Sequence, residues 1–533
     1  LADSPSTYDD GGNGVGNYCT LNPLTSSGYT ISNGNLQVAS GSGSNRLLGT
    51  IGVSSGKYYF EAVFNSQSSS SDSSYLVVRN EDGFEAGIRN RTSDTVYFTS
   101  SGGTLGTYSS SIWSTSDVHG FALDCDNNQL KIYKNNTLTA TISLTANKTY
   151  FPGYYRDSGS NANFGFNFGA RSFAYTPPTG FKALNTFNLD DPTIADPSLY
   201  FDTKTYTGNG STQAISGLNF SSDLVWIKQR NAAADHNLFD IVRGVQKRLF
   251  SNSTAAEGTI STGLTAFNSD GWTMGSSGNI NGNNNTYVGW AWDAGSEDAE
   301  TNDAGSIDSE VKANTSAGFS IASYEGTGSS ATVGHGLNAA PNFIIIKNRD
   351  RDYSDDDWRV WHSSLAANER LVLSGGNSAG SGPTVWQNTL PTSAVFYLDG
   401  DRRYNNSGDD HIAYCWSEVE GYSKFGTYEG NDSTDGTYVH LGFRPAMILI
   451  KNIDVLADWA IYDNKRDTFN EAAKVLSPNT NGGGNANDAW AGSYPVDFLS
   501  NGFKPRTTTG EINDTYTYIY CAWASSPFKY SNA

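Results

Sequence analysis

The chain has 533 residues, of which 13% are aromatic and only 17% are charged, and its formal net charge is −20. A surface of that sign repels phosphate backbones and anionic lipids, which argues against nucleic acid and membrane as partners. Its four cysteines form no CxxC pair, which argues against a disulfide framework and a thiolate zinc site. Abundant glycine with many aromatic residues indicates an all-β protein divided into several domains.

Residues 1–188 are predicted to form a first domain, a β-sandwich. "GKYYFEAVF" (residues 56–64) and "FGFNFGARSFAYTPPTGFKALN" (residues 164–185) alternate apolar with polar or small residues, which is the period of a strand. "GFALDCDNNQLKIYKNN" (residues 120–136) is typical of a hairpin with its turn at Asp126-Asn127-Asn128. The sequence begins with Leu1 rather than Met, which is consistent with a processed or partial chain and leaves an upstream anchoring segment open.

The first domain also contains a candidate ligand-binding loop, "PGYYRDSGSNANFG". Tyr154, Tyr155, Arg156 and Asp157 would place aromatic faces and polar groups in a segment rich in glycine and serine. Such a combination is suited to binding sugars or protein surfaces. The alternative is an ordinary loop with one packed tyrosine.

Two connecting segments follow. Residues 189–200 contain two Asp-Pro steps, which favour extended backbone and turns, and are predicted to be a linker. Residues 296–317 carry six acidic side chains and one lysine, and are predicted to be a solvated acidic linker.

The remaining chain contains three internal repeats, predicted as β-sandwich domains over residues 201–295, 318–420 and 421–533. Each begins with a tyrosine and a glycine-rich turn, continues into an apolar run that ends at a lysine ("DLVWIKQR", "NFIIIKNR", "AMILIKNI"), and closes on an aromatic strand. The apolar run is short and contains β-branched residues, so it is predicted to be a strand buried on both faces. The repeat markers are Tyr206, Lys228 and Trp292, then Tyr324, Lys347 and Trp416, and finally Tyr428, Lys451 and Trp523.

We interpret the marker residues as structural. The three lysines are predicted to lie where the strand leaves the core, with their ammonium groups reaching water, in preference to forming a repeated ligand contact. The three tryptophans are predicted to anchor the cores rather than to form exposed binding platforms.

The loop "RDRDYSDDDW" (residues 349–358) is a weak candidate for a calcium site. Asp352, Asp355 and Asp357 could supply the oxygen ligands that this cation prefers. Alternatively, Arg349, Arg351 and Arg359 partner these carboxylates. No other cofactor is expected.

No catalytic motif is present. The six histidines form no H-E-x-x-H motif and there is no phosphate-binding loop. "GVSSG" (residues 52–56) matches the nucleophile elbow only formally, because a predicted strand rather than a helix follows it. The chain is therefore not expected to be an enzyme.

Six further segments are distinctive: "DSPSTYDDGGNGVGNYCTLNPL", "TIGVSSGKYYFEAVF", "FGFNFGARSFAYTPPTGFKALN", "DPTIADPSLYFDTKTYTGNGSTQ", "GHGLNAAPNFIIIKNR" and "VEGYSKFGTYEGN". They resemble a family of bacteriophage tail-fibre and virion structural proteins that have an N-terminal SPRY-like domain followed by tandem β-domains. The resemblance extends over nearly the whole chain. It implies a concanavalin-like sandwich at the N-terminus and a place on the surface of a virion, and it supplies no catalytic residue.

The expected function is therefore structural: a tail fibre, spike or surface fibre of a tailed phage that recognises host glycans. Tandem domains predict an elongated rod, and other virion proteins are expected partners. A homo-oligomer, with a trimer as the first guess, would strengthen weak contacts by avidity. One alternative is a purely architectural head fibre, decoration or tail-wall protein. A polysaccharide depolymerase is less expected, because neither a β-helix nor a carboxylate cleft is recognisable in the sequence.

Overall fold

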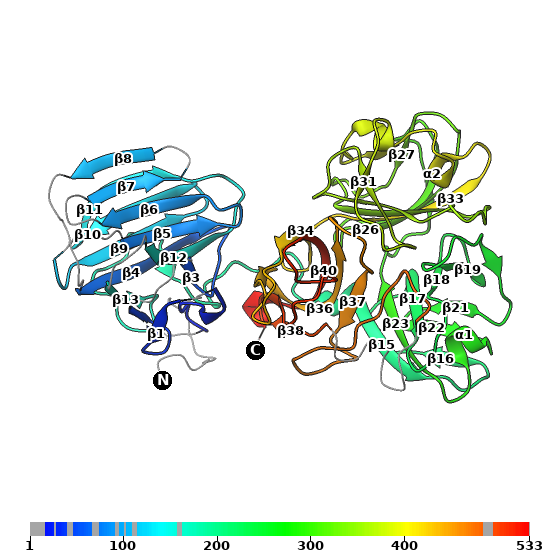
Figure 1. Cartoon of the computed structure of the whole chain (residues 1–533), viewed down its shortest axis with the longest axis horizontal. Coiled ribbons are helices and arrows are strands. Elements are labelled where there is room, and N and C mark those ends of the chain that lie inside the picture. The colour runs from blue at the N-terminus through cyan, green and yellow to red at the C-terminus, as the bar shows by residue number, and fades with distance from the viewer. Residues whose placement is uncertain are drawn as a thin grey trace. The chain divides into compact units, whose positions relative to one another are not determined.

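The structure is a computed structural model of the whole chain (Figure 1). It describes residues 16–25, 28–39, 46–66, 74–90, 95–100, 103–108, 114–156, 162–482 and 494–531. The chain divides into two compact units, Leu1–Asp191 and Pro192–Ala533. None of the helices among the described residues is long and apolar enough to cross a membrane.

The N-terminal unit is a β-sandwich of two mainly antiparallel sheets (Figure 1). One sheet has the order β1-β2-β13-β4-β9-β10-β11, with β14 beside β4, and the other has the order β3-β12-β5-β6-β7-β8. The elements are η1 (Pro23–Thr25), β1 (Thr30–Ser32), β2 (Gln37–Ala39), β3 (Leu47–Leu48), β4 (Lys57–Ser66), β5 (Ser74–Asn80), β6 (Glu85–Asn90), β7 (Thr95–Thr99), β8 (Gly103–Tyr108), β9 (Val118–Asp124), β10 (Gln129–Lys134), β11 (Thr137–Ser143), β12 (Tyr150–Arg156), β13 (Asn163–Asn167) and β14 (Lys182–Ala183).

Sequence periodicity predicted parts of this sandwich correctly. Strand β4 covers "KYYFEAVF", and β9 and β10 form the expected hairpin, with Asn128 in the left-handed conformation (φ 52°) that tight turns require. The alternating segment that starts at Phe164 is a strand only as far as Asn167, and most of the residues that follow are irregular. The fold class is all-β, as expected.

The second unit consists of the three repeats, each with one large and one small sheet. The large sheets have the orders β15-β23-β17-β18-β19-β20, β24-β25-β26-β33-β28-β29-β30-β31 and β34-β40-β36-β37. The small sheets are β16-β22-β21, β27-β32 and β35-β39-β38.

The bounds of these elements are as follows. Repeat 1 and the segment before it contain η2 (Pro197–Leu199), β15 (Phe201–Thr207), β16 (Gln213–Ile215), β17 (Leu224–Gln229), β18 (Asn237–Asp240), β19 (Lys247–Phe250), β20 (Gly258–Thr259), β21 (Leu264–Asn268), β22 (Gly271–Met274), α1 (Gly278–Asn281) and β23 (Thr286–Trp292). Repeat 2 and the segment before it contain β24 (Glu300–Asn302), β25 (Ser309–Asn314), β26 (Phe319–Glu325), β27 (Ala331–Gly334), β28 (Phe343–Asn348), β29 (Arg359–His362), β30 (Glu369–Val372), β31 (Gly380–Ser381), η3 (Val385–Asn388), β32 (Val395–Leu398), α2 (Arg402–Asn405) and β33 (Asp410–Trp416). Repeat 3 contains β34 (Ser423–Glu429), β35 (Val439–His440), β36 (Phe443–Asn452), β37 (Ala460–Asp463), β38 (Val496–Leu499), β39 (Gly502–Pro505), β40 (Thr517–Pro527) and η4 (Phe528–Tyr530).

The three repeats share one strand arrangement. In each, the apolar strand that ends at the marker lysine pairs antiparallel with the closing aromatic strand, and the closing tryptophan faces the start of the apolar run. The facing pairs are Leu224 with Trp292, Phe343 with Trp416, and Met447 with Trp523. The prediction of three related β-domains with a central buried strand is therefore confirmed.

One prediction about the connections is wrong. The acidic segment 296–317 is not a free linker, because β24 and β25 within it extend the large sheet of repeat 2. The boundary between the two compact units lies within the segment 189–200, after Asp191, and the side chain of Ile194 is buried in the core of the second unit. The strands of segment 296–317 were not recognised because the segment is rich in acidic residues. A strand can contain such residues, since only every second side chain needs to face a core.

The three repeats do not form the expected rod. Trp292, Trp416 and Trp523 meet in a single hydrophobic cluster, with ring centroids 6.0, 5.5 and 5.9 Å apart. Each of the three rings therefore contacts the other two. The repeats pack around this common centre, so the tryptophans are core anchors, as expected, but of one shared core.

The marker lysines do not reach water as predicted, because all three side chains are fully buried. Lys347 Nζ donates to the carbonyl oxygen of Thr254 in repeat 1, and Lys451 Nζ donates to that of Gly376 in repeat 2. Lys228 Nζ donates to the carbonyl oxygen of Gln229. Burial lowers the pKa of Lys347 and of Lys451 to about 8. These two ammonium groups join neighbouring repeats instead of reaching water.

The joints between repeats form a closed cycle, in which repeat 2 contacts repeat 1, repeat 3 contacts repeat 2, and repeat 1 contacts repeat 3. Each joint includes a hydrogen bond from a side chain to a backbone carbonyl. The bonds run from Trp358 Nε1 to Phe250 at 2.8 Å, from Trp459 Nε1 to Val372 at 2.9 Å, and from Ser251 Oγ to Pro478 at 2.7 Å.

Two of the three joints contain a fully buried ion pair that begins at the last residue of β18 or β37. In each, the aspartate accepts a hydrogen bond from an aromatic residue of the adjoining repeat. The pairs are Asp240–Arg243, contacted by Tyr414 of repeat 2, and Asp463–Arg466, contacted by Trp290 of repeat 1. In the third joint the matching residue, at the end of β29, is His362, whose Nε2 lies 3.2 Å from the carbonyl oxygen of Tyr520. Leu365 takes the place of the arginine.

Candidate functional site

The candidate ligand loop at residues 154–157 is mostly not a loop. Tyr154, Tyr155 and Arg156 lie on β12 and are buried, and each pairs with a residue of β5. Asp157 lies outside the described residues. Tyr154 points into the sandwich, where its ring is 5.4 Å from that of Phe164. Because side chains alternate along a strand, Tyr155 lies on the opposite, outer face of the six-stranded sheet.

The outer face around Tyr155 gathers aromatic and charged side chains. The ring of Tyr155 stacks on that of Tyr75 at 4.1 Å, and the guanidinium of Arg46 lies 4.2 Å from the Tyr155 centroid. The ring of Phe98 packs edge-on against Tyr75 at 5.5 Å. Arg89 is opposite Tyr75 in the register of β5 and β6, so it belongs to the same face. We call this surface the arginine–tyrosine face, made of Arg46, Tyr75, Arg79, Glu85, Arg89, Phe98 and Tyr155.

Glu85 is the buried centre of the charged groups on this face. Its carboxylate binds Arg46 Nε at 2.8 Å and Arg79 Nη1 at 2.5 Å, while its own side chain is only 4% exposed. Hydrogen bonding to Glu85 raises the pKa of Arg46, and burial together with the Glu85 charge raises the pKa of Tyr155. Both groups therefore keep their protons near neutral pH. Because this carboxylate binds both Arg46 and Arg79, it fixes the positions of their guanidinium groups.

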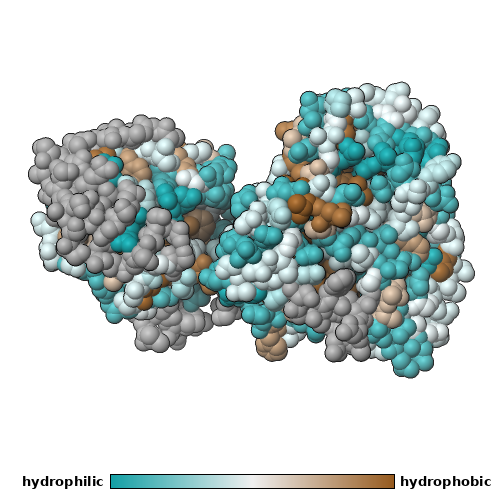
Figure 2. Space-filling view, in the orientation of Figure 1, coloured by the Kyte–Doolittle hydropathy of each residue, from teal (hydrophilic) through white to brown (hydrophobic). Residues whose placement is uncertain are grey.

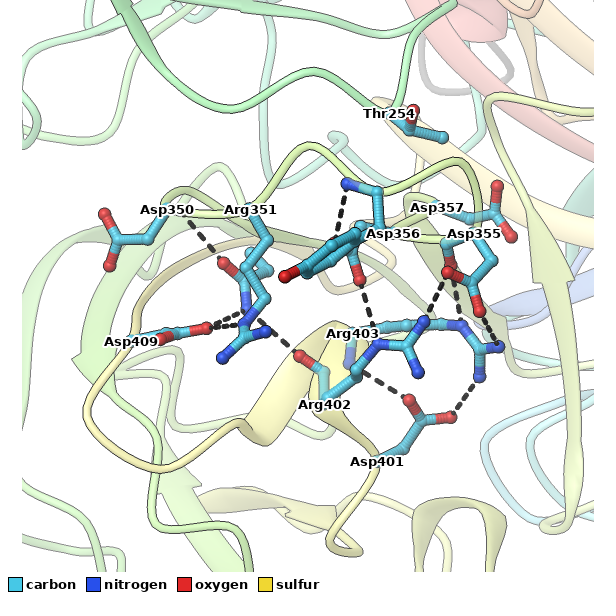
Figure 3. Close-up of polar contacts among 12 residues, drawn as sticks. Thr254, Asp350, Arg351, Asp355, Asp356, Asp357, Asp401, Arg402, Arg403 and Asp409 are labelled. Carbon is cyan, nitrogen blue, oxygen red and sulfur yellow. Dashed lines mark hydrogen bonds and ion pairs between the residues drawn. The ribbon is translucent and has the colours of Figure 1, made fainter.

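The second charged cluster is a corner of repeat 2 (Figure 3). Arg402 and Arg403 of helix α2 both bind the carboxylate of Asp355, and Arg403 also binds Asp401 at 2.9 Å. Arg351 binds Asp409. We call this cluster the charged corner. Pairing with Arg402 lowers the pKa of Asp355, so that carboxylate remains ionised.

The charged corner is an addition to repeat 2 alone. The residue just before the next strand lies eleven positions after the marker lysine in repeat 2, at Trp358. Its counterparts, His236 and Trp459, lie only eight positions after theirs. The helical turn that supplies Arg402 and Arg403 begins with Gly278-Asn279 in repeat 1, and repeat 3 has Gly510-Glu511 there. The longer acidic loop and the two arginines therefore occur together.

The calcium candidates do not form a cation site. Within the described ranges, no group of three or more His, Cys, Asp and Glu side chains is arranged to hold a metal ion. Asp355 is bound by two arginines, Asp357 lies 3.8 Å from Arg359, and the side chain of Asp352 is exposed. Of the arginines expected to partner these carboxylates, Arg359 pairs with Asp357, whereas Arg349 binds Glu257 and Arg351 binds Asp409. Asp355 is bound instead by Arg402 and Arg403, which come from a distant segment.

Sequence reasoning missed most of the arginine–tyrosine face. It selected Tyr155, but placed it in a loop and overlooked Arg46, Tyr75 and Glu85. The signal in the sequence was the alternation in "SYLVVRN", which puts Tyr75, Val77 and Arg79 on one side of β5. The pairing of β5 with β12 and β6, which brings the other residues to that side, has no local signature.

Comparisons with known proteins give one family and a set of solved structures. Chains similar to this one include the PSpry domain of TRIM65 (14% identity, TM-score 0.22, covering 28% of this chain and 92% of that one) and the SPRY domain of human HERC1 (17% identity, TM-score 0.23, covering 27% and 96%). No curated protein sequence matches the chain. The model of a domain of unknown function, DUF7483, matches residues 196–527, which is more than half of the chain and includes all three repeats. The chain therefore belongs to the DUF7483 family.

Proposed function

We propose that the chain is a structural, non-enzymatic component of a tailed-phage virion, a tail fibre, spike or surface fibre that recognises glycans on the host surface. In this proposal it lies on the outside of the particle and contacts other virion proteins. It forms a homo-oligomer, with a trimer as the first expectation, so that weak single contacts add up through avidity.

The observation that carries the recognition part is the arginine–tyrosine face. It combines two arginines, Arg46 and Arg79, whose side chains are 41% and 28% exposed, with a stacked pair of buried tyrosine rings, one of which packs against Arg46. Guanidinium groups donate several hydrogen bonds in a fixed geometry, and aromatic rings packed against them hold them in place. Tyr75 and Arg79 lie on β5 and Tyr155 lies on β12, which hold them more rigidly than a loop would, and Arg46 directly precedes β3.

A purely architectural role is the second candidate, and the joints between repeats favour it. Fully buried ion pairs and lysines hold the three repeats together, and the charged corner is neutralised internally. A unit built in this way resists disassembly without needing any ligand. In that case the protein would be a head fibre, decoration or tail-wall protein.

Two measurements separate these candidates. Immunogold labelling of native particles locates the chain, and binding of the fluorescent full chain to permissive and non-permissive cells measures recognition. The proposal expects label at the particle surface and binding to permissive cells only. Surface label without binding to any permissive host leaves the architectural role, and absence of label from the particle contradicts both.

A further inference from the structure

We propose that the arginine–tyrosine face binds the carboxylate groups of an acidic saccharide. This inference rests on the proposed glycan recognition and assigns the chemical class of the sugar. The face belongs to the six-stranded sheet of the N-terminal unit, between β3 and β7 (Figure 1).

The first argument is charge. Among the described residues, the face carries three arginines, Arg46, Arg79 and Arg89, and one acidic residue, Glu85, in a chain whose formal net charge is −20. A local excess of positive charge on so acidic a protein attracts anions to that place and repels them elsewhere.

The second argument is accessibility. The side chains of Arg46 and Arg79 are 41% and 28% exposed, whereas that of Glu85 is 4% exposed. The face therefore presents its cations to solvent and keeps its carboxylate inside. An arriving anion meets the two guanidinium groups, and the buried Glu85 holds them at fixed positions.

The third argument is geometry. The Arg46 guanidinium lies over Tyr155, with its Cζ 4.2 Å from the ring centroid, and donates to Glu85 through Nε at 2.8 Å and Nη2 at 3.5 Å, so contacts from two directions fix its position. A planar guanidinium held in this way matches a carboxylate, which it can bind by two parallel hydrogen bonds. A lysine would not offer this fork.

The fourth argument concerns the sugar ring. In the register of the sheet, the row Gly153–Val77–Gly87–Phe98 runs beside the row that contains Tyr155 and Tyr75. Gly153 and Gly87 in this row have no side chain, and the row also contains Leu48, which is opposite Gly153, and the partly buried ring of Phe98. Aromatic rings next to small residues suit the apolar side of a pyranose, so the ligand class is a saccharide with a carboxylate rather than a free inorganic anion.

The test uses the purified full chain and polygalacturonate oligosaccharides, in which every sugar has a carboxylate, with neutral dextran of the same size as reference. Calorimetric titration at low and at physiological salt should show binding of the uronate and none of dextran. Arg46→Gln and Arg79→Gln should each weaken it by about tenfold, as expected for loss of a charge-assisted bidentate contact. Arg46→Lys, which keeps the charge but loses the fork, should also weaken it.

Arg402→Gln is the matched control. Its side chain is 42% exposed and paired with a carboxylate, like that of Arg46, but it lies in the charged corner of the second unit. It removes the same charge and should leave uronate binding unchanged. Near-ultraviolet circular dichroism of each variant shows whether the sandwich remains folded, and Arg79→Gln provides a second test if Arg46→Gln unfolds it.

The outcomes are distinct from those of the proposed function. If the wild-type chain does not bind the uronate, or if Arg402→Gln weakens binding as much as Arg46→Gln, the inference is overturned, even when the chain still binds permissive cells. If uronate binding depends on Arg46 and Arg79, the inference stands, even when labelling does not find the chain at the surface of the particle.

Discussion

In the N-terminal unit, Glu85 is bound by two arginines that remain partly exposed, whereas in the three-repeat unit Arg243 and Arg466 are fully buried against Asp240 and Asp463. The same kind of ion pair therefore has two different settings. At the outer face of a sheet it leaves the guanidinium groups partly exposed to solvent. Between repeats it is closed off from solvent and can serve only the structure. Exposure, and not the residue types, distinguishes the proposed recognition surface from a joint.

The largest effect should come from the shared core. Trp416→Ala removes a ring that contacts those of Trp292 and Trp523, and a buried Trp→Ala change costs up to about 5 kcal/mol. We expect a lower urea midpoint for the whole three-repeat unit, measured by far-ultraviolet circular dichroism. Leu390→Ala, at a side chain 54% exposed, is the control and should change little. Loss confined to repeat 2 by hydrogen exchange would contradict a shared core.

The next effect should come from a buried joint. Arg466→Ala leaves the Asp463 carboxylate buried without its partner, which should reduce the free energy of unfolding by about 3–4 kcal/mol. The double variant Asp463→His with Arg466→Leu copies His362 and Leu365 of the third joint, and should recover much of the loss. Equal stability of the single variant and the wild type in urea denaturation would show that the pair is not needed.

An intermediate effect is expected at Asp223, where burial raises the pKa to about 7 and the neighbouring Asp293 also opposes ionisation. Lys312, whose Nζ lies 3.9 Å from Asp223 Oδ1, partly offsets this rise of the pKa. Tyr422 also interacts electrostatically with Asp293. Because the folded pKa is above the unfolded value of about 4, the folded state holds the extra proton between about pH 4 and 7. Stability should therefore fall as pH rises through this window and stay level above it.

Asp223→Asn removes this titration and has a natural precedent. Asn342 holds the matching position in repeat 2, where its Oδ1 accepts a hydrogen bond from the Glu418 amide at 2.8 Å, as Asp223 Oδ2 does from Ala294 at 2.7 Å. Relative to the wild type, the free energy of unfolding of the variant should rise by about 2 kcal/mol between about pH 5.5 and pH 8. Urea unfolding at each pH measures this difference. Parallel curves for the two proteins would refute the raised pKa.

The smallest effect is expected in the charged corner. Arg402→Gln removes an ion pair at the surface, where solvent screens the attraction, so the urea midpoint should not change measurably. Arg466→Gln, the same substitution at a buried pair, is the comparison and should shift the midpoint clearly. A large change at Arg402 would mean that the charged corner supports the fold of repeat 2.

Much of the fold could be predicted because its signals are local. The runs that end at Lys228, Lys347 and Lys451 are buried strands, and their repetition revealed three related domains. The closure of the repeats could not be predicted, because contacts such as Ser251 with Pro478 join residues 227 positions apart. For the same reason the lysines were expected at a solvated rim, since the carbonyls that bind two of them belong to another repeat.

The candidate site shows the same limit. Tyr155 was selected for its composition, but its partner Tyr75 lies 80 positions earlier and Arg46 lies earlier still. Only the strand order of the sheet brings the three together. The calcium hypothesis failed similarly, because the arginines that bind Asp355 come from a segment 47 and 48 positions later.

The cyclic closure has an evolutionary consequence. In an assembly of three identical chains, any substitution appears at every joint at once. Here the three subunit-like parts are translated as one polypeptide, so each joint is free to diverge by itself. Two features of repeat 2 are differences of this kind. His362 and Leu365 stand where the other two joints have an ion pair, and helix α2 has two arginines that the other repeats lack. Each feature occurs in one repeat only and so breaks the threefold symmetry.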